Sequence, residues 1–298
     1  YWEIEEVPLA TRSTETEDFC DKLYETTTYR NSEGRYVVSL PFKHEFPKYL
    51  SLGNSRNIAR SQFIRNEARL LKNPELKSQY DGVINEYIDL GHMREIAPPN
   101  NEASCYYMPH HAVIKPDSVT TKLRVVFNAS SPSSNGVTLN SVLFPFPVLQ
   151  ADLTILILRW RLYRFVFNAD IEKMYRQILV HPKHTTYQRI LFRRNPEEDI
   201  KDYELRTVTF GVNCAPYLAI KTLLQLASDC KARSPAAVEI LENHMYVDDV
   251  LAGSHELEDG LKKRDELFEV LQSAGFILRK CTANHIRLLK NIPEESLL

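Results

Sequence analysis

The sequence predicts an α+β fold, in which short strands are interspersed with amphipathic helices. An aromatic and β-branched run over 164–170 is typical of a strand in a packed sheet. Residues 216–231 and 256–273 carry apolar side chains at helical spacing. A pair of short apolar runs encloses Tyr246-Val247-Asp248-Asp249 and predicts a hairpin. These patterns place helices and strands within one chain without internal repeats.

The first half of the chain contains one clear helix start. Asn73 is expected to cap a helix, with Pro74 in its first position and Glu75 as a first-turn acid, and we expect that helix to continue to about residue 91. The other elements expected here are an extended, irregular lead-in with two strand-like runs over 1–50, a helix over 55–72, strands within 92–128 and a turn-rich loop over 130–136.

The second half alternates between strands and helices. We expect helices over 149–163, over 216–231, just before Tyr246 and over 256–273, and strands over 164–170, 186–193 and 203–210 and from Gly275 onward.

Two adjacent carboxylates, Asp248 and Asp249, lie between apolar flanks. Successive side chains of a strand point to opposite faces, so both can reach one site only if the pair occupies a tight turn between two short strands. A rigid hairpin that displays two carboxylates suits Mg²⁺. An ordinary exposed turn could have the same four residues, so the tetrapeptide alone does not decide.

A third carboxylate, Asp170, follows the strand-like run directly. After it, apolar residues recur at the i, i+3, i+4 and i+7 spacing from Ile171, which predicts a helical turn. Asp170 is therefore expected where a strand gives way to a helix. Three carboxylates in such positions could hold two divalent ions about 3.5–4 Å apart for phosphoryl displacement. Capping the following turn is the alternative role of Asp170, and the two roles are compatible.

Composition and charge exclude several classes of protein. The apolar fraction of 43% is ordinary for a globular chain, and no apolar run approaches the roughly 20 residues of a membrane span, so we expect no membrane partner. Five scattered cysteines without a Cys-x-x-Cys pair argue against a disulfide framework or a zinc ribbon. The net charge is −2, so nucleic-acid binding, if present, should weaken steeply with salt.

A series of further short motifs accompanies the three carboxylates in a fixed order. They are Gly-Arg-Tyr-Val-Val-Ser-Leu-Pro-Phe at 34–42, His-His-Ala-Val-Ile-Lys-Pro at 110–116, Thr-Lys-Leu-Arg-Val-Val-Phe-Asn-Ala-Ser at 121–130, Thr-Phe-Gly-Val-Asn-Cys-Ala-Pro at 209–216 and Gly-Phe-Ile-Leu-Arg-Lys at 275–280, with Tyr175 five residues after Asp170. From about residue 2 to 284 the chain resembles the reverse transcriptases of Pao/BEL-type LTR retrotransposons.

The resemblance implies a right-hand polymerase architecture without a complete thumb. The palm would have an antiparallel sheet backed by helices. Because the sequence begins with Tyr rather than Met, we expect a fragment of a pol polyprotein. The expected parts are an N-terminal extension over 1–50, fingers over 51–148, the first part of the palm over 149–180, a return to the fingers over 181–206 and the second part of the palm over 207–298.

The resemblance also implies catalytic roles for the carboxylates. Asp170 and Asp248 would be the principal ligands of two Mg²⁺ ions, with Asp249 as the supporting carboxylate. The backbone carbonyl of Ile171 would complete one coordination sphere, and Mn²⁺ could replace Mg²⁺.

Further residues would bind substrates in the resembling family. Lys122 and Arg124 would hold the incoming triphosphate, and a paired charge on a strand is the alternative role for both. Tyr175 would be a steric gate that excludes the 2′-hydroxyl of a ribonucleotide. Phe210 and Gly211 would contact the nascent base pair, and Tyr246 would contact the primer terminus. Lys280 would protonate the departing pyrophosphate, and a structural role is an equal alternative for it.

The implied function is RNA-directed DNA polymerisation, with dNTPs added to the 3′-hydroxyl of a DNA primer on an RNA or DNA template. The expected partners are the thumb, RNase H and integrase of the same polyprotein, and the expected location is the cytoplasm, within a virus-like particle, or the nucleus. Asn128, Ser141 and Cys281 depart from the family pattern. They leave open a catalytically silent, domesticated or decayed remnant that only binds nucleic acid or protein. An aspartic peptidase is rejected, since no Asp-Thr-Gly or Asp-Ser-Gly occurs.

Overall fold

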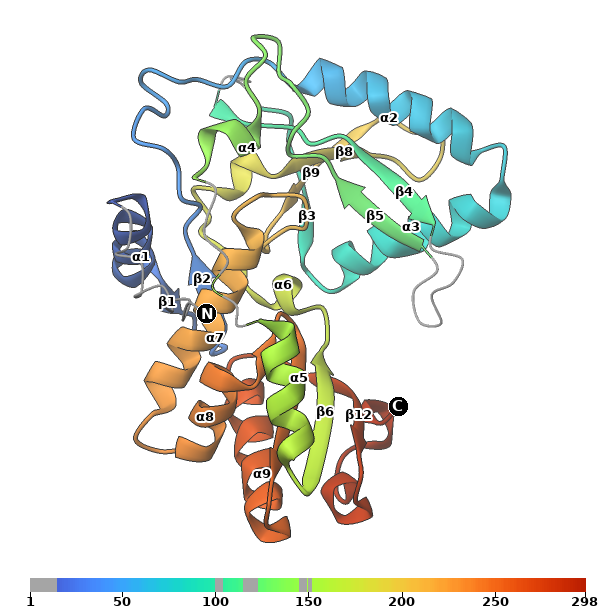
Figure 1. Cartoon of the computed structure of the whole chain (residues 1–298). Coiled ribbons are helices and arrows are strands. Elements are labelled where there is room, and N and C mark those ends of the chain that lie inside the picture. The colour runs from blue at the N-terminus through green and yellow to red at the C-terminus, as the bar shows by residue number, and fades with distance from the viewer. Residues whose placement is uncertain (1–14, 100–103, 115–122, 145–148, 150–151) are drawn as a thin grey trace, which may run out of the picture.

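The structure, a computed structural model, describes residues 15–99, 104–114, 123–144, 149 and 152–298. Its mixture of helices and mostly antiparallel strands confirms the predicted α+β content. In Figure 1 most strands gather in an upper part and a lower part, and the N-terminal strands and a long helix lie between them. A continuous cluster of buried side chains extends through both parts. The upper and lower parts are therefore packed together by a shared core.

The upper part contains two small sheets flanked by two helices (Figure 1). One sheet has the strand order β3-β9-β8, and the other is the hairpin β4-β5. Helix α3 packs against β5 and thereby supports the hairpin. The bounds are Arg56–Leu70 for α2, Pro74–Asp89 for α3, Met93–Ile96 for β3, His110–Ile114 for β4, Leu123–Phe127 for β5, Leu139–Val142 for α4, Arg189–Phe192 for β8 and Lys201–Leu205 for β9.

The start of α3 is the one that the sequence predicts. The Asn73 side chain accepts a hydrogen bond from the backbone N–H of Leu76 at 3.1 Å, Pro74 opens the helix, and Glu75 lies in its first turn. Because the first N–H groups of a helix have no partner inside it, this cap fixes where α3 begins.

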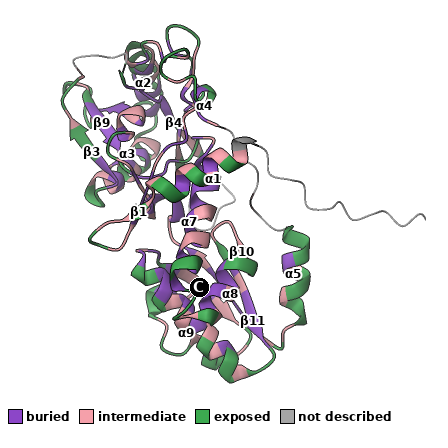
Figure 2. Ribbon diagram, turned by 90° about the vertical axis from the view of Figure 1, so that its left-hand side faces the viewer, coloured by how far each residue is buried: buried purple, intermediate pink, exposed green. Residues whose placement is uncertain are grey.

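The lower part is built on a four-stranded antiparallel sheet with the order β10-β11-β6-β12. Helix α9 packs on one face of this sheet and α5 lies on the other side (Figures 1 and 2). The Trp160 indole of α5 donates a hydrogen bond to the Ala252 carbonyl of β11 at 3.1 Å. The bounds are Leu153–Leu162 for α5, Phe165–Ile171 for β6, Ala215–Cys230 for α7, Pro235–Asn243 for α8, Met245–Tyr246 for β10, Asp249–Ser254 for β11, Leu257–Ser273 for α9 and Leu278–Ala283 for β12.

The N-terminal region differs from the expected irregular lead-in. Helix α1 spans Glu15–Thr27 and is followed by β1 (Tyr29–Arg30) and β2 (Tyr36–Val38). Cys20 and Tyr24, one helical turn apart, are buried, and the Tyr24 hydroxyl lies 2.9 Å from that of Thr222 on α7. The acidic, Thr-rich sequence concealed this helix, since its stability comes from packing on α7 rather than from helix propensity.

Two local predictions in the second half are wrong. The strand expected over 203–210 is β9, which ends at Leu205, because the chain then leaves the sheet and Val208 N–H bonds the Ile178 carbonyl at 2.9 Å. The helical turn expected from Ile171 begins later, as α6 (Met174–Gln177), because Ile171 still belongs to β6. Lys173, at φ 50°, lies between the strand and the short helix. After α6 the chain forms β7 (Leu179–Val180), parallel to β2.

Exposure is concentrated on the outer helix faces, as Figure 2 shows. Within the residues that the structure describes, no helix is both long and apolar enough to cross a membrane. The five cysteines are buried and are not joined by disulfides.

Candidate active site

The pairing of β6 with β11 places Asp170 directly opposite Asp249. Alternation along β6 buries Phe167, Ala169 and Ile171 in the core and leaves Asp170 on the other face. Directly opposed residues of an antiparallel pair have their Cβ atoms about 4.5–5.5 Å apart and on the same face. Two carboxylates from distant parts of the sequence are therefore brought together by the pairing of these two strands.

The third carboxylate comes from the hairpin that joins β10 to β11. Tyr246 pairs with Asp249, so Val247 and Asp248 are the two turn residues. The hairpin was predicted, but only Asp248 of the acidic pair lies in its turn, since Asp249 already begins β11. Val247 adopts φ 54°, a left-handed conformation that is strained for a β-branched side chain. The Asp248 carbonyl accepts a hydrogen bond from the Ile171 N–H at 2.8 Å, which ties the turn to the end of β6.

Burial and neighbouring negative charge disfavour the ionised forms of Asp248 and Asp249. The pKa of Asp248 is raised, first by burial and then by the nearby charge of Asp170. The pKa of Asp249 is raised by burial and by the charges of Asp248 and Asp170. The positive charge of Lys280 offsets part of both increases, and that of Arg124 offsets part of the increase at Asp248. The site thus carries more negative charge than the protein itself neutralises.

Lys280 forms an ion pair with Asp170, at 2.7 Å between Nζ and Oδ2. The register between β12 and β6 shifts after Arg279, and Lys280 adopts φ 53° in this bulge. Arg279, the strand partner of Asp170, instead bonds the carboxylate of Glu172 at 3.1 Å. Because a bulge inserts an extra residue, two consecutive basic side chains can both reach acidic groups near the end of β6.

Arg124 of β5, in the upper part, acts electrostatically on the hairpin turn. Its charge offsets part of the rise in the pKa of Asp248. Lys122, the other expected triphosphate ligand, lies outside the described residues.

Tyr175 of α6 and Phe210 form an aromatic pair beside the carboxylates. Their ring centroids are 4.1 Å apart, and Phe210 is half exposed whereas Tyr175 is buried. Burial, with a smaller contribution from the charge of Asp248, raises the pKa of Tyr175 to about 12. The Tyr175 side chain is therefore a neutral phenol at physiological pH, and it packs against the Phe210 ring.

Tyr246, the residue expected to contact the primer terminus, lies on β10, and its side chain is partly buried.

Gly211 follows Phe210 and has φ 100°. A Cβ at this position would lie 2.1 Å from the Phe127 carbonyl oxygen, so only glycine fits. Asn140, which the sequence did not single out as a site residue, holds the loop from the other side. Its side chain donates to the Gly211 carbonyl at 3.0 Å and accepts from the Asn213 N–H at 2.8 Å. Side chain–backbone contacts between segments far apart in the sequence thus fix the loop, and no local pattern at Asn140 reveals them.

The described residues contain no group of three or more His, Cys, Asp or Glu side chains arranged to hold a metal ion. Asp170 instead has the Lys280 ammonium as its counter-charge. In chemical terms the donors fit a hard divalent cation, since they are carboxylate oxygens with unneutralised negative charge. The charge and the donor type of these residues therefore suit Mg²⁺, while in this structure Asp170 is paired with Lys280.

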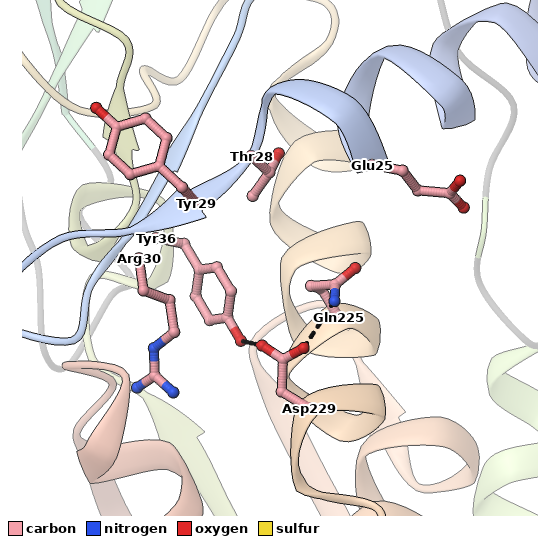
Figure 3. A pocket seen from close by; sticks show the side chains of 7 residues that line it. All are labelled: Glu25, Thr28, Tyr29, Arg30, Tyr36, Gln225 and Asp229. Atoms are coloured by element: carbon pink, nitrogen blue, oxygen red, sulfur yellow. Dashed lines mark hydrogen bonds between the residues drawn. The ribbon is translucent and has the colours of Figure 1, made fainter.

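A separate hollow lies between the N-terminal segment and α7 (Figure 3). Its walls bond one another: the Tyr36 hydroxyl donates to Asp229 at 2.5 Å, and Gln225 donates to the same carboxylate at 2.8 Å. Arg30 donates to the Gly34 carbonyl at 2.7 Å. The hydrogen bond between Tyr36 and Asp229 attaches the N-terminal strands to α7. None of the carboxylates described above lines this hollow.

A comparison with protein families finds one match, over residues 119–284, to the model of reverse transcriptase (RNA-dependent DNA polymerase). The match covers more than half of the chain. The chain belongs to the reverse transcriptase family. Reverse transcriptases are a family of nucleotidyltransferases. The matched range includes Asp170, Asp248, Asp249 and Lys280, so the carboxylates and their counter-ion lie in the part of the chain that defines the family. No curated protein matches the chain.

The fit of Gly211 predicts a large effect for a single methyl group. Gly211→Ala should destabilise the protein by about 1–3 kcal/mol, because the left-handed backbone and the Phe127 carbonyl both exclude a Cβ. The measurement is urea unfolding. Gly82→Ala is the matched control, since nothing lies within 4 Å of its Cβ position, and there we expect a gain of about 0.4–1 kcal/mol. Equal effects at the two positions would contradict the close approach.

The crowding of carboxylates predicts that a charge-removing substitution stabilises the metal-free protein. Asp249→Asn should raise the free energy of unfolding by about 0.5 kcal/mol at pH 7 in EDTA, the size of an exposed charge interaction. Because the folded-state pKa of Asp249 is raised, the wild-type protein gains stability as the pH falls through that pKa, and its difference from the variant should disappear once the pH is below the ordinary pKa of an unfolded aspartate. Asp199→Asn, on an exposed loop, is the control. A loss of stability in Asp249→Asn would show that the repulsion is absent.

Proposed function

We propose that this chain is the fingers and palm of an RNA-directed DNA polymerase that adds dNTPs to a primer 3′-hydroxyl by a two-metal mechanism. The observation that carries the proposal is the pairing of Asp170 with Asp249 in β6 and β11, with Asp248 in the adjoining turn. Family membership says which reaction such carboxylates serve, and the geometry says which residues of this chain could perform it.

The two parts of the fold support a division into fingers and palm. Residues 51–148 and 181–206 would be the fingers, and 149–180 and 207–298 the palm, after an N-terminal extension over 1–50. This division agrees with the upper strands and the lower four-stranded sheet of Figure 1. A thumb, an RNase H domain and an integrase would follow in the same polyprotein. The motifs 110–116 and 209–216 favour a Pao/BEL-type retrotransposon as the source.

Asp170, Asp248 and Asp249, with the Ile171 carbonyl, would hold two Mg²⁺ ions, which Mn²⁺ could replace. When bound, the ions would lower the pKa of the primer hydroxyl and neutralise the charge of the leaving pyrophosphate. The raised pKa values of Asp248 and Asp249 support this assignment, since a site with unneutralised carboxylates gains from a cation.

Other residues of the chain would bind and orient the substrates. Arg124, already close enough to influence Asp248, would form bidentate hydrogen bonds with the triphosphate, assisted by Lys122. The Tyr175 ring, fixed by Phe210, would lie beneath the deoxyribose, and the Phe210–Gly211 segment would contact the nascent base pair. Tyr246 would contact the primer terminus. DNA synthesis by this chain would take place in the cytoplasm, within a virus-like particle, or in the nucleus.

Primer extension on an RNA template tests the proposal directly. The purified chain should incorporate dNTPs with Mg²⁺ or Mn²⁺, and Asp249→Asn should lower the rate by at least about 100-fold, because the supporting metal ligand is lost. Asp199→Asn is the matched control and should keep wild-type activity. If the chain is inactive even when fused to its downstream thumb, while folded and metal-bound, the silent remnant is the correct interpretation.

The gate assigned to Tyr175 makes a separate prediction. Tyr175→Val should raise incorporation of ribonucleotides relative to deoxyribonucleotides by at least about tenfold, because the missing ring leaves room for the 2′-hydroxyl. Tyr175→Phe is the control and should keep the discrimination, since the ring and its contact with Phe210 remain. Competition between rUTP and dTTP in single-nucleotide extension measures the ratio. An unchanged ratio in Tyr175→Val would exclude the gate.

A further inference from the structure

Lys280 occupies the position that a cation bound by Asp170 would need. Its Nζ lies 2.7 Å from Asp170 Oδ2, and its charge also acts on Asp248 and Asp249. Among the described residues no metal-binding group of acidic side chains is formed. The ammonium is thus a counter-charge that acts on all three carboxylates in this structure.

A backbone bulge in β12 places the Lys280 side chain beside Asp170. The bulge in β12 follows Arg279, and Lys280 itself adopts φ 53°, a conformation that a non-glycine residue takes only at some cost. Arg279, which faces Asp170 in the strand register, bonds Glu172 instead. Without the bulge, regular alternation would turn the residue after Arg279 toward the opposite face of the sheet.

The pair can open without disturbing the fold. The Lys280 side chain is 43% exposed, whereas that of Asp170 is 24% exposed. The lysine side chain can therefore rotate into solvent while the carboxylate, on a central strand, stays in place. A partly exposed ion pair contributes little stability, so a divalent cation can displace the ammonium.

We propose that Lys280 acts as a resident cation, which neutralises Asp170 while the polymerase is metal-free and must leave Asp170 before the first divalent ion binds. This inference rests on the metal site of the proposed function. The ammonium stabilises the crowded carboxylates in the absence of metal and competes with metal for the same oxygen atoms. Metal binding then releases the lysine side chain into solvent.

Binding of Mn²⁺ to the whole chain, measured by the loss of the free-ion EPR signal without nucleic acid or nucleotide, tests the proposal. Lys280→Met should lower the dissociation constant for the first ion by about 2- to 5-fold, because the competing charge is gone. Lys280→Arg keeps the charge and should bind no more tightly than the wild type. Lys290→Met, which removes an exposed lysine of the same part of the chain, should match the wild type.

Thermal unfolding in EDTA supplies a readout that does not involve metal. Lys280→Met should lower the midpoint by about 1–3 °C in the wild-type background and by less in an Asp170→Asn background, since the pair is already broken there. Equal Mn²⁺ affinity of the wild type and Lys280→Met would overturn the resident-cation role while leaving the metal site intact. Absence of Mn²⁺ binding in every variant would overturn both the role and the metal site of the proposed function.

Discussion

The register between β6 and β11 is the constraint on which the site depends. In this register Asp170 lies directly opposite Asp249, so the two carboxylates are on the same face of the sheet. A shift by one residue would turn one of the two carboxylates into the core and bring an apolar side chain out. The buried face formed by Phe167, Ala169 and Ile171 prevents such a shift, because each of these side chains packs into the shared core. Hydrophobic burial beneath the sheet thus fixes the position of the charges above it.

That arrangement costs stability at the site itself. Burial and mutual repulsion raise the pKa of Asp248 and of Asp249, and Val247 holds a strained backbone conformation beside them. The hydrogen bond from Ile171 N–H to the Asp248 carbonyl restrains the turn despite this cost. Strain and unneutralised charge that persist in a well-packed environment are typical of functional sites. Here the packing is supplied by helix α9 and the sheet, and the charge by three residues at one end of that sheet.

The sequence predicted those elements of the fold and of the site that depend on local patterns. The strand before Asp170, the hairpin around Asp248 and the helix that Asn73 caps follow from periodicity and turn chemistry over a few residues. It could not predict the bulge that brings Lys280 to Asp170, because register is decided between strands that are distant in the sequence. The need for glycine at 211 is similar, since the excluding atom is the carbonyl oxygen of Phe127. Helix α1 was missed because its burial comes from a partner helix, which single-sequence patterns do not reveal.

A second electrostatic contact, centred on Glu86 of α3, joins the upper part to the segment that follows β6. Its carboxylate forms ion pairs with Arg176 of α6, at 2.7 Å, and with Lys173, at 3.4 Å. The Arg176 side chain is buried, lies over the Tyr87 ring and donates to His92, whose pKa falls to about 4 through burial and the neighbouring arginine. Because His92 stays neutral, it can accept that hydrogen bond at physiological pH. Helix α3 supports β5, which carries Arg124, so this cluster couples the residue that would hold the triphosphate to the strand that carries Asp170.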